Sequence, residues 1–278
     1  MISPNSKKKY RTIRPILPSS AIKAQYQKAL LELIAEMHNS VTYWIKARYR
    51  ERLDDIVVAS DESAPRSLQK ELNRRRSQWR NNFKEHANKQ SRKFTSKVHT
   101  AVKLQLANSI REKAANFIWE GKKVSRRLNN VIQSTINENI GLISSIPDQY
   151  LSQANTIIMQ GVKNGRDMGF IVTELEKQCK VAENRAIIIA RDQTNKATEA
   201  INTAICQDIG ITEGIWMHRM GSKVPRSTHM DVLDGEKFTL SEGLYDPDKR
   251  VERFISPGEL INCHCTYLPI IPGLEGEV

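Results

Sequence analysis

The pattern of hydrophobic and polar positions predicts that the first half of the chain is helical. From Ile22 to Leu53 apolar residues recur every three or four positions, which is typical of one long amphipathic helix, with Ser19 and Ser20 placed to cap it. A polar break follows at 54–65. The helical pattern resumes from Ser67 to about Ala87 and, after a polar stretch at 88–92, from Phe94 to about Trp119.

The same spacing predicts further helices beyond residue 120. One runs from Val124 to Ile140, and Pro147 is well placed as the first residue of another that extends to about Lys163. A short helix is expected at 171–178. The Ala- and Ile-rich segment 183–208 has the clearest helical pattern, and Gly210 is placed to end it as a C-cap.

After Gly210 the helical periodicity gives way to short apolar segments. Ile215–His218 is a strand candidate, and 230–240 is interpreted as a hairpin across Asp234 and Gly235. A charged loop at 241–252 and a final strand-like segment at 262–271 complete the chain.

These patterns predict an α+β protein with a mainly helical N-terminal half. A small α+β domain with short strands and a hairpin follows. The expected domains are a basic extended arm at 1–20, a basic helical region at 21–138 and the α+β domain at 139–278.

The charge is unevenly distributed along the chain, whose formal net charge is +12. Residues 1–140 contain 29 Lys and Arg against 12 Asp and Glu, whereas residues 141–278 contain 14 against 19. A basic half of this kind favours contact with a polyanion such as double-stranded DNA, bound through phosphates without reading of sequence. A solvated basic surface is the alternative. The candidate contacts are Lys7, Lys8, Lys9, Arg74, Arg75, Arg76, Arg80, Lys122, Lys123, Arg126 and Arg127.

Several classes of protein are not expected from this sequence. It contains no apolar run of about 18 residues, so we expect no membrane partner, and its polar, basic N-terminus does not indicate a secretory signal. Its four cysteines are too few and too scattered for a disulfide framework and indicate a reducing compartment.

Cys263 and Cys265 are the strongest candidates for site chemistry. Together with His264, His229 or His218 they offer the sulfur and nitrogen ligands that zinc takes. The single residue between them is shorter than the usual gap in zinc fingers, so a buried turn with hydrogen-bonded thiols is the alternative. Zinc is thus a possible cofactor, and no other is expected.

No catalytic motif surrounds these residues, and we expect a protein that is not an enzyme. Cys263 lacks the local motif of a thiol protease. A metal-dependent nuclease or other hydrolase centred on His229 and the pair Cys263 and Cys265 is the alternative function, because a bound ion can generate a nucleophile for phosphodiester hydrolysis.

The second half of the chain contains several short motifs whose combined order and spacing are specific, although each motif alone is weak. The motifs are Asn139–Pro147, Ala190–Asn195, Trp216, Arg226–His229, Leu233–Gly235, Phe238, Pro257–Gly258, Asn262–Cys265 and Pro269. From about residue 139 the chain thereby resembles the phage minor head proteins typified by the F protein of phage Mu, also called head morphogenesis proteins.

The resemblance implies a structural minor capsid protein that acts in phage head assembly near the portal. It implies the portal and other capsid proteins as partners, and the virion as its location, with the host cytoplasm during assembly. The helical half would dock on the portal or contact DNA; a plain DNA-binding accessory factor is a further alternative. A polar cluster is expected, with Arg191 beside an acidic partner: Arg191, Arg226, His229, Asp234, Gly235, Asn262, Cys263 and Cys265.

Overall fold

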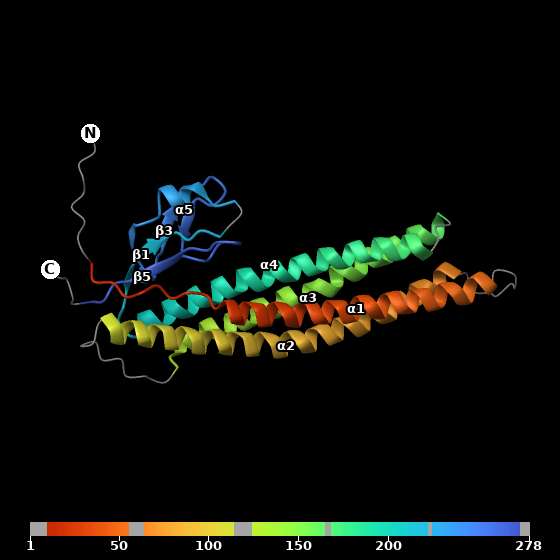
Figure 1. The fold of residues 1–278 in the computed structure, drawn as a ribbon, viewed down its shortest axis with the longest axis horizontal. Coiled ribbons are helices and arrows are strands. Elements are labelled where there is room, and N and C mark those ends of the chain that lie inside the picture. Colours follow the sequence, from red (N-terminus) through yellow and green to blue (C-terminus); the bar gives the residue numbers. More distant parts are fainter. Residues whose placement is uncertain (1–9, 56–63, 114–123, 165–167, 222–223, 273–278) are drawn as a thin grey trace. The chain divides into compact units, whose positions relative to one another are not determined.

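The structure, a computed structural model, describes residues 10–55, 64–113, 124–164, 168–221 and 224–272. The described residues form four long helices followed by short strands in two small sheets (Figure 1). The expected α+β class, with helices first and short strands last, is therefore confirmed.

The contacts within the chain divide it into two compact units. The helical unit contains Lys23–Phe94 and Ile136–Ala190. The mixed unit contains Met1–Ile22, Thr95–Thr135 and Arg191–Val278. Each unit thus combines segments that are far apart in the sequence. The domain boundaries expected after residues 20 and 138 stay a prediction.

Helix α1 (Ser20–Asp55) confirms the first long helix that the apolar spacing predicts. The Ser19 hydroxyl accepts a hydrogen bond of 3.3 Å from the backbone N–H of Ile22, which is the geometry of an N-cap. The expected capping by a serine is therefore present at Ser19.

Helix α2 (Ala64–Lys113) is continuous, so the break expected at 88–92 is wrong. The polar residues there keep the helical phase of the buried face. Phe83, Ala87 and Ser91 are all buried and four residues apart, and Phe94 continues the series. Local polarity therefore did not interrupt an amphipathic pattern whose buried positions stay in register. The end expected near Trp119 lies outside the described residues.

Helices α3 (Arg126–Lys163) and α4 (Met168–Asp208) also join segments that the sequence pattern separates. Pro147 lies inside α3 and does not begin a helix. A proline in a helix interior costs about 3 kcal/mol, but the buried face continues on both sides of it through Ile146 and Tyr150. In α4 the expected interruption between residues 178 and 183 is absent, because Cys179 and Ala182 are buried in phase with Leu175.

The C-cap expected at Gly210 is confirmed. Gly210 has a φ of +86°, in the left-handed region that favours glycine. Its N–H donates to the carbonyl of Gln207 at 3.2 Å, and the N–H of Ile211 donates to that of Cys206 at 2.9 Å. This pair of bonds is a Schellman motif, and it turns the chain from α4 into the first strand.

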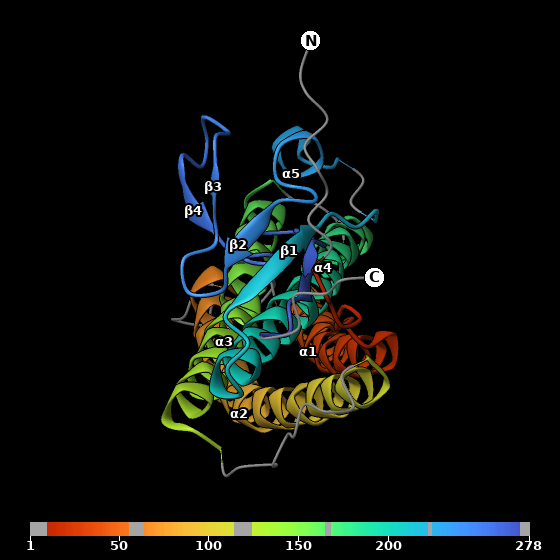
Figure 2. The same cartoon turned by 90° about the vertical axis from the view of Figure 1, so that its left-hand side faces the viewer.

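The mixed unit contains an antiparallel three-stranded sheet in the order β2-β1-β5 (Figure 2). Its strands are β1 (Glu213–Met217), β2 (Lys237–Thr239) and β5 (Thr266–Pro269). The strand expected at 215–218 is thus present as β1. The hairpin expected across Asp234 and Gly235 is wrong, because β2 pairs with β1 and the residues before the turn form helix α5 (Ser227–Asp231).

A second, two-stranded sheet has its first strand in the segment 241–252, which was expected to be a loop, and its second strand directly after it. It consists of β3 (Leu244–Asp246) and β4 (Arg253–Ile255), which pair antiparallel. The many charged residues of this segment hid the short strands, since both strands have exposed positions and only Asp246, Ile255 and the half-buried Leu244 turn inward.

The described part of the N-terminal arm is packed into the mixed unit. The N–H of Ile13 donates to the carbonyl of Pro269 at 3.1 Å, and the N–H of Ile271 donates to that of Arg11 at 3.0 Å. Ile13 and Ile16 are each 1% exposed. The arm is extended, as expected, but it extends the edge of the sheet beside β5 and contributes to the core.

The helical unit is held together by apolar contacts and a few buried polar ones. The ring of Tyr26 stacks on that of Phe94 with centroids 4.3 Å apart, and its hydroxyl donates to Asn139 Oδ1 at 2.6 Å. The Arg75 guanidinium lies 4.0 Å from the centroid of the Trp44 ring. Among the described helices, none has an apolar stretch of the length needed to cross a bilayer.

Candidate metal centre

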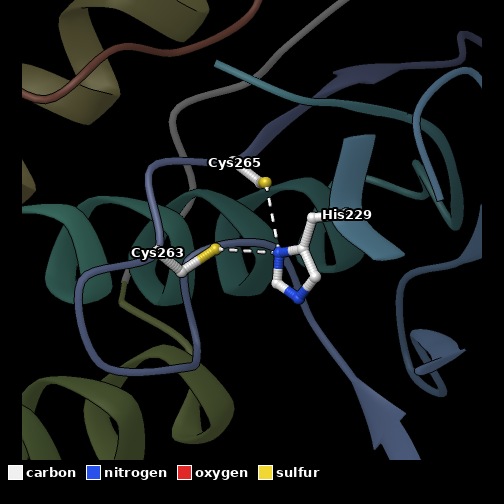
Figure 3. Close-up of side chains that lie close together, drawn as sticks. All are labelled: His229, Cys263 and Cys265. Carbon is white, nitrogen blue, oxygen red and sulfur yellow. Dashed lines mark hydrogen bonds between the residues drawn. The ribbon is translucent and has the colours of Figure 1, made fainter. Parts of the chain in front are cut away.

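Three buried side chains of the mixed unit converge on one point. His229 comes from α5, and Cys263 and Cys265 come from the loop that leads into β5 (Figure 3). His229 Nδ1 lies 3.6 Å from Cys263 Sγ and 3.5 Å from Cys265 Sγ. The three potential ligand atoms all lie within 4.8 Å of one another. The exposed fractions are 2% for the histidine and 4% and 2% for the cysteines, so the cluster is closed to bulk solvent.

The other nitrogen of His229 faces a buried carboxylate. Asp246, the last residue of β3, is 0% exposed, and its Oδ2 lies 3.1 Å from His229 Nε2. Asp246 Oδ1 accepts a hydrogen bond of 3.0 Å from the backbone N–H of Asp248. The Trp216 ring meets the imidazole edge-on at a centroid distance of 5.5 Å. The imidazole is thus fixed in orientation from three sides.

A second histidine stands beside the cluster. His218 directly follows β1, and its Nδ1 lies 3.5 Å from Cys265 Sγ. Its backbone N–H donates to Asp234 Oδ1 at 2.6 Å. Gly235, in the left-handed region at a φ of +82°, donates its N–H to the carbonyl of Trp216 at 2.9 Å. The Asp-Gly turn therefore holds the segment after β1 next to the cysteines.

The proximity of these groups shifts their proton affinities. A hydrogen bond from the Cys265 thiol, helped by His229, lowers the pKa of Cys263 to about 4 against the opposing effect of burial. The same bond to Cys263, together with burial, raises the pKa of Cys265 above its ordinary range. Burial lowers the pKa of His229, but Cys263 and Asp246 outweigh this effect, and the net pKa is raised. The cluster thus favours a thiolate.

Helix α4 positions the cysteine loop through a row of polar side chains. Asp192 Oδ1 accepts a hydrogen bond of 2.7 Å from the N–H of Asn262, and Arg191 Nη2 donates to Asn262 Oδ1 at 2.7 Å. Asn195 Nδ2 donates to the carbonyl of Cys263 at 3.2 Å and lies 3.3 Å from His264 Nδ1. Asn262 itself has a φ of +59°, so these contacts support a strained turn.

The motif Pro257–Gly258 brings the chain against the same helix. A Cβ at Gly258 would lie 2.8 Å from Glu199 Cγ, so this position has room only for glycine, whose φ is +76°. Glu199 is 3% exposed, and burial raises its pKa well above the ordinary value. Sequence analysis identified the glycine but not the buried carboxyl that it faces.

The structure brings together part of the polar cluster expected from sequence. His229, Cys263 and Cys265 meet, and Asp234 and Gly235 hold the adjacent segment. Arg226 lies at the margin, where its Nη2 donates to the carbonyl of Ile261 at 3.1 Å. The partner observed for Arg191 is the amide of Asn262, where a carboxylate was expected.

Of the three histidines considered as ligands, the structure places His229 and His218 at the cysteines and turns His264 toward Asn195. Asp246 was missed. It lies in a segment rich in charged residues, where nothing in the sequence distinguishes a buried carboxylate from a solvated one.

The candidate nucleic-acid contacts differ in how exposed they are. Arg75 is 9% exposed and pairs with Glu71 at 2.8 Å, which gives it a structural role. Arg80 pairs with Asp148, and Arg127 lies 3.6 Å from Asp208. Arg74 and Arg126 are exposed, and Arg76 is half-buried. Lys7, Lys8, Lys9, Lys122 and Lys123 lie outside the described residues.

Comparison with known proteins finds a family and one relative. Residues 152–268 match a family described as phage Mu protein F like protein. An uncharacterized protein of Haemophilus influenzae is 24% identical over 272 residues, which is 98% of this chain. The chain spans 58% of that relative's length. No solved structure matches the chain.

The matched segment contains every residue of the cluster and of its support by α4 and β3. It also coincides with most of the region in which the sequence motifs resemble minor head proteins. That resemblance is confirmed over residues 152–268, which match the phage Mu protein F like family.

Proposed function

We propose that this chain is a minor structural protein of a phage head that assembles with the capsid near the portal. The match of residues 152–268 to the phage Mu protein F like family carries the proposal. The ordered set of motifs, from Arg191 on α4 to Cys265 before β5, supports it, because these residues build one continuous polar network in the mixed unit.

The test is co-purification of the full-length, tagged chain with phage particles from producing cells. We expect the chain in procapsids and mature heads at a low copy number relative to the major capsid protein, together with the portal. Heads that assemble and package DNA without containing the chain would contradict the proposal. So would a chain found only free in the lysate.

The full chain is required for this experiment. Deletion of residues 1–140 would remove Ile13 and Ile16, which are buried in the mixed unit. It would also remove the part of α2 that belongs to the same unit. The hydroxyl of Ser109 accepts a hydrogen bond of 2.7 Å from the N–H of Arg14. Loss of such a truncated protein from heads would therefore report misfolding of the mixed unit as readily as loss of a docking surface.

Contact with packaged DNA is a second part of the proposal. The excess of Lys and Arg in residues 1–140 supports it, and the exposed Arg74 and Arg126 are the described side chains best placed to meet phosphates. Binding is expected to be independent of sequence and to weaken steeply as salt rises.

A hydrolase centred on His229 and the cysteines has less support. A metal-dependent nuclease keeps an open coordination position that its substrate can reach, whereas these three side chains are almost fully buried. Incubation of the purified chain with linear DNA and divalent cations is the check. Cleavage that disappears with His229→Ala would establish the enzyme.

A further inference from the structure

We propose that the mixed unit binds one zinc ion through His229, Cys263 and Cys265, with His218 as the fourth ligand. The ion would be structural. It would join the residue after β1, helix α5 and the loop before β5, which are separate along the chain. The proposal concerns the folded chain alone and does not rest on a role in phage heads.

The distances between the ligand atoms match a tetrahedral zinc site. With Zn–S bonds of about 2.3 Å and Zn–N bonds of about 2.0–2.1 Å, tetrahedral angles place a sulfur and a nitrogen ligand about 3.6 Å apart. The observed distances from His229 Nδ1 to the two sulfur atoms are 3.6 and 3.5 Å. An ion between the three atoms can therefore bind all of them close to their present positions (Figure 3).

A hydrogen bond from the Cys265 thiol to Cys263 accounts for the contact between the two sulfur atoms, but not for two sulfur atoms at one nitrogen of a neutral imidazole. Asp246 is an acceptor, so a neutral His229 carries its proton on Nε2 and presents a lone pair at Nδ1. One lone pair accepts one S–H, yet two sulfur atoms approach Nδ1 at nearly equal distances. A metal ion uses the lone pair and both sulfurs together. The carboxylate of Asp246 then orients the imidazole and increases its basicity, as carboxylates commonly do behind zinc-bound histidines.

The short spacing of the two cysteines is compatible with this geometry. In strand-like backbone, residues two apart project to the same face and the residue between them projects to the other. Cys263 and Cys265 accordingly both reach His229, whereas His264 faces Asn195. Strand β5 begins directly after Cys265.

His218 completes the coordination from the edge of the site. Its Nδ1 lies 3.5 Å from Cys265 Sγ, the distance expected for two ligands of one ion, but it is outside the group of atoms that lie within 4.8 Å of one another. As the fourth ligand, His218 would have to turn its side chain toward His229. The ligand set is then two cysteines and two histidines, which is typical of structural zinc.

The elements in this part of the mixed unit are short. Helix α5 has 5 residues, and β2, β3 and β4 have 3 each. Elements of this length are marginal on their own and depend on tertiary contacts. A metal cross-link between α5, β1 and the cysteine loop would therefore contribute directly to the folding free energy of this region.

The first test is the metal content of the purified full-length chain. The protein is prepared under reducing conditions without chelators or a metal-affinity tag, and analysed by elemental mass spectrometry. We expect about one zinc ion per chain. Protein that is folded, has free thiols and contains no zinc, and that takes up none from a solution of zinc chloride followed by desalting, would overturn the proposal.

Matched variants test the assignment of the ligands. His229→Ala and Cys263→Ser should lose stoichiometric zinc, whereas Cys206→Ser should keep it. Cys206 is a buried cysteine of α4 outside the cluster, so it matches Cys263 in residue type and burial. Zinc retained by His229→Ala, or lost with Cys206→Ser, would overturn this ligand set.

Cobalt substitution provides a readout that does not depend on folding of a variant. Wild-type chain is stripped of metal and reloaded with Co²⁺. We expect intense ligand-field bands in the visible spectrum, which indicate four-coordinate geometry, and a near-ultraviolet band from thiolate-to-cobalt charge transfer. His218→Ala should keep the thiolate band and alter the ligand-field bands. Weak, octahedral-type bands without a thiolate band in the wild type would contradict a buried cysteine site.

Discussion

His229 shows how one side chain can be oriented through both of its ring nitrogens. The sequence places it in a motif of Arg, Ser, Thr and His. In the structure Nε2 faces Asp246 and Nδ1 faces two sulfur atoms. The cysteines could be proposed as partners from sequence, because both are ligand types. Asp246 could not, since its burial depends on the pairing of β3 with β4, and the sequence does not indicate these strands.

Asp246→Asn tests whether this carboxylate orients the metal-binding imidazole. The asparagine keeps the shape of the side chain and removes its charge, so we expect the affinity for zinc to fall about 10–100-fold. Competition with a chromophoric chelator measures the change, and the variant should still bind stoichiometric zinc at saturation. Asp248→Asn is the control, because Asp248 pairs with Arg250. Equal affinities for Asp246→Asn and wild type would contradict a positioning role.

Glu199 is a second residue whose environment only the structure defines. Burial raises the pKa of its carboxyl well above the ordinary value, against smaller opposing effects of Thr266 and Arg219. A raised pKa in the folded state means that the folded chain holds this proton at a pH where the unfolded chain has lost it. The contribution of Glu199 to the free energy of unfolding is therefore present at acidic pH. It is lost as the pH rises from the pKa of Glu199 in the unfolded chain to its pKa in the folded chain.

Glu199→Gln should consequently flatten the dependence of stability on pH. Denaturant unfolding between about pH 5 and pH 8 should show a smaller loss of stability for the variant than for the wild type, because its amide does not ionise. Glu236→Gln, at an exposed position, should leave the profile unchanged. Parallel profiles for wild type and Glu199→Gln would show that the buried carboxyl does not govern this part of the pH response.

At the scale of elements, apolar periodicity located the helices but not their ends. The expected breaks at residues 88–92, at Pro147 and after 178 all rest on local signals: polar residues, a proline or a gap in spacing. Each was overridden because buried positions such as Ser91, Ile146 and Ala182 continue the same face. Helix propensities differ by up to about 0.7 kcal/mol among ordinary residues and by about 3 kcal/mol for proline, and burial of a continuous face exceeds this. The sequence alone does not reveal which tertiary contacts will supply that burial.

The N-terminal segment was expected to be a basic arm, and its described residues behave instead as an element of the mixed unit. Ile13→Ala should lower the free energy of unfolding by about 2–5 kcal/mol, because a fully buried isoleucine leaves a cavity. Leu17→Ala, at a side chain that is 40% exposed in the same segment, should change it by less than about 1 kcal/mol. Chemical denaturation compares the two. Equal, small effects would mean that the segment is dispensable for the unit.

At the scale of the whole molecule, the two compact units do not follow the order of the sequence. Residues 95–135 belong with the strands of the last quarter of the chain, and residues 136–190 belong with the first helices. The excess of positive charge in residues 1–140 is therefore shared between both units. Some of these basic side chains stabilise the fold: Arg75 pairs with Glu71, and its guanidinium lies over the ring of Trp44. The charge count therefore overstates the number of residues that can contact DNA.

The double variant Arg74→Ala/Arg126→Ala tests the exposed part of that charge. If each arginine meets a phosphate, the slope of log affinity for random-sequence duplex DNA against log salt should decrease in magnitude by about 2. Titrations by fluorescence anisotropy at several salt concentrations measure it. Lys249→Ala, an exposed lysine of the other half of the sequence, is the control and should keep the wild-type slope.

A double variant with the wild-type slope would show that these two arginines do not contact DNA. A wild-type chain that does not bind DNA even at low salt would leave the basic surface to an acidic protein partner.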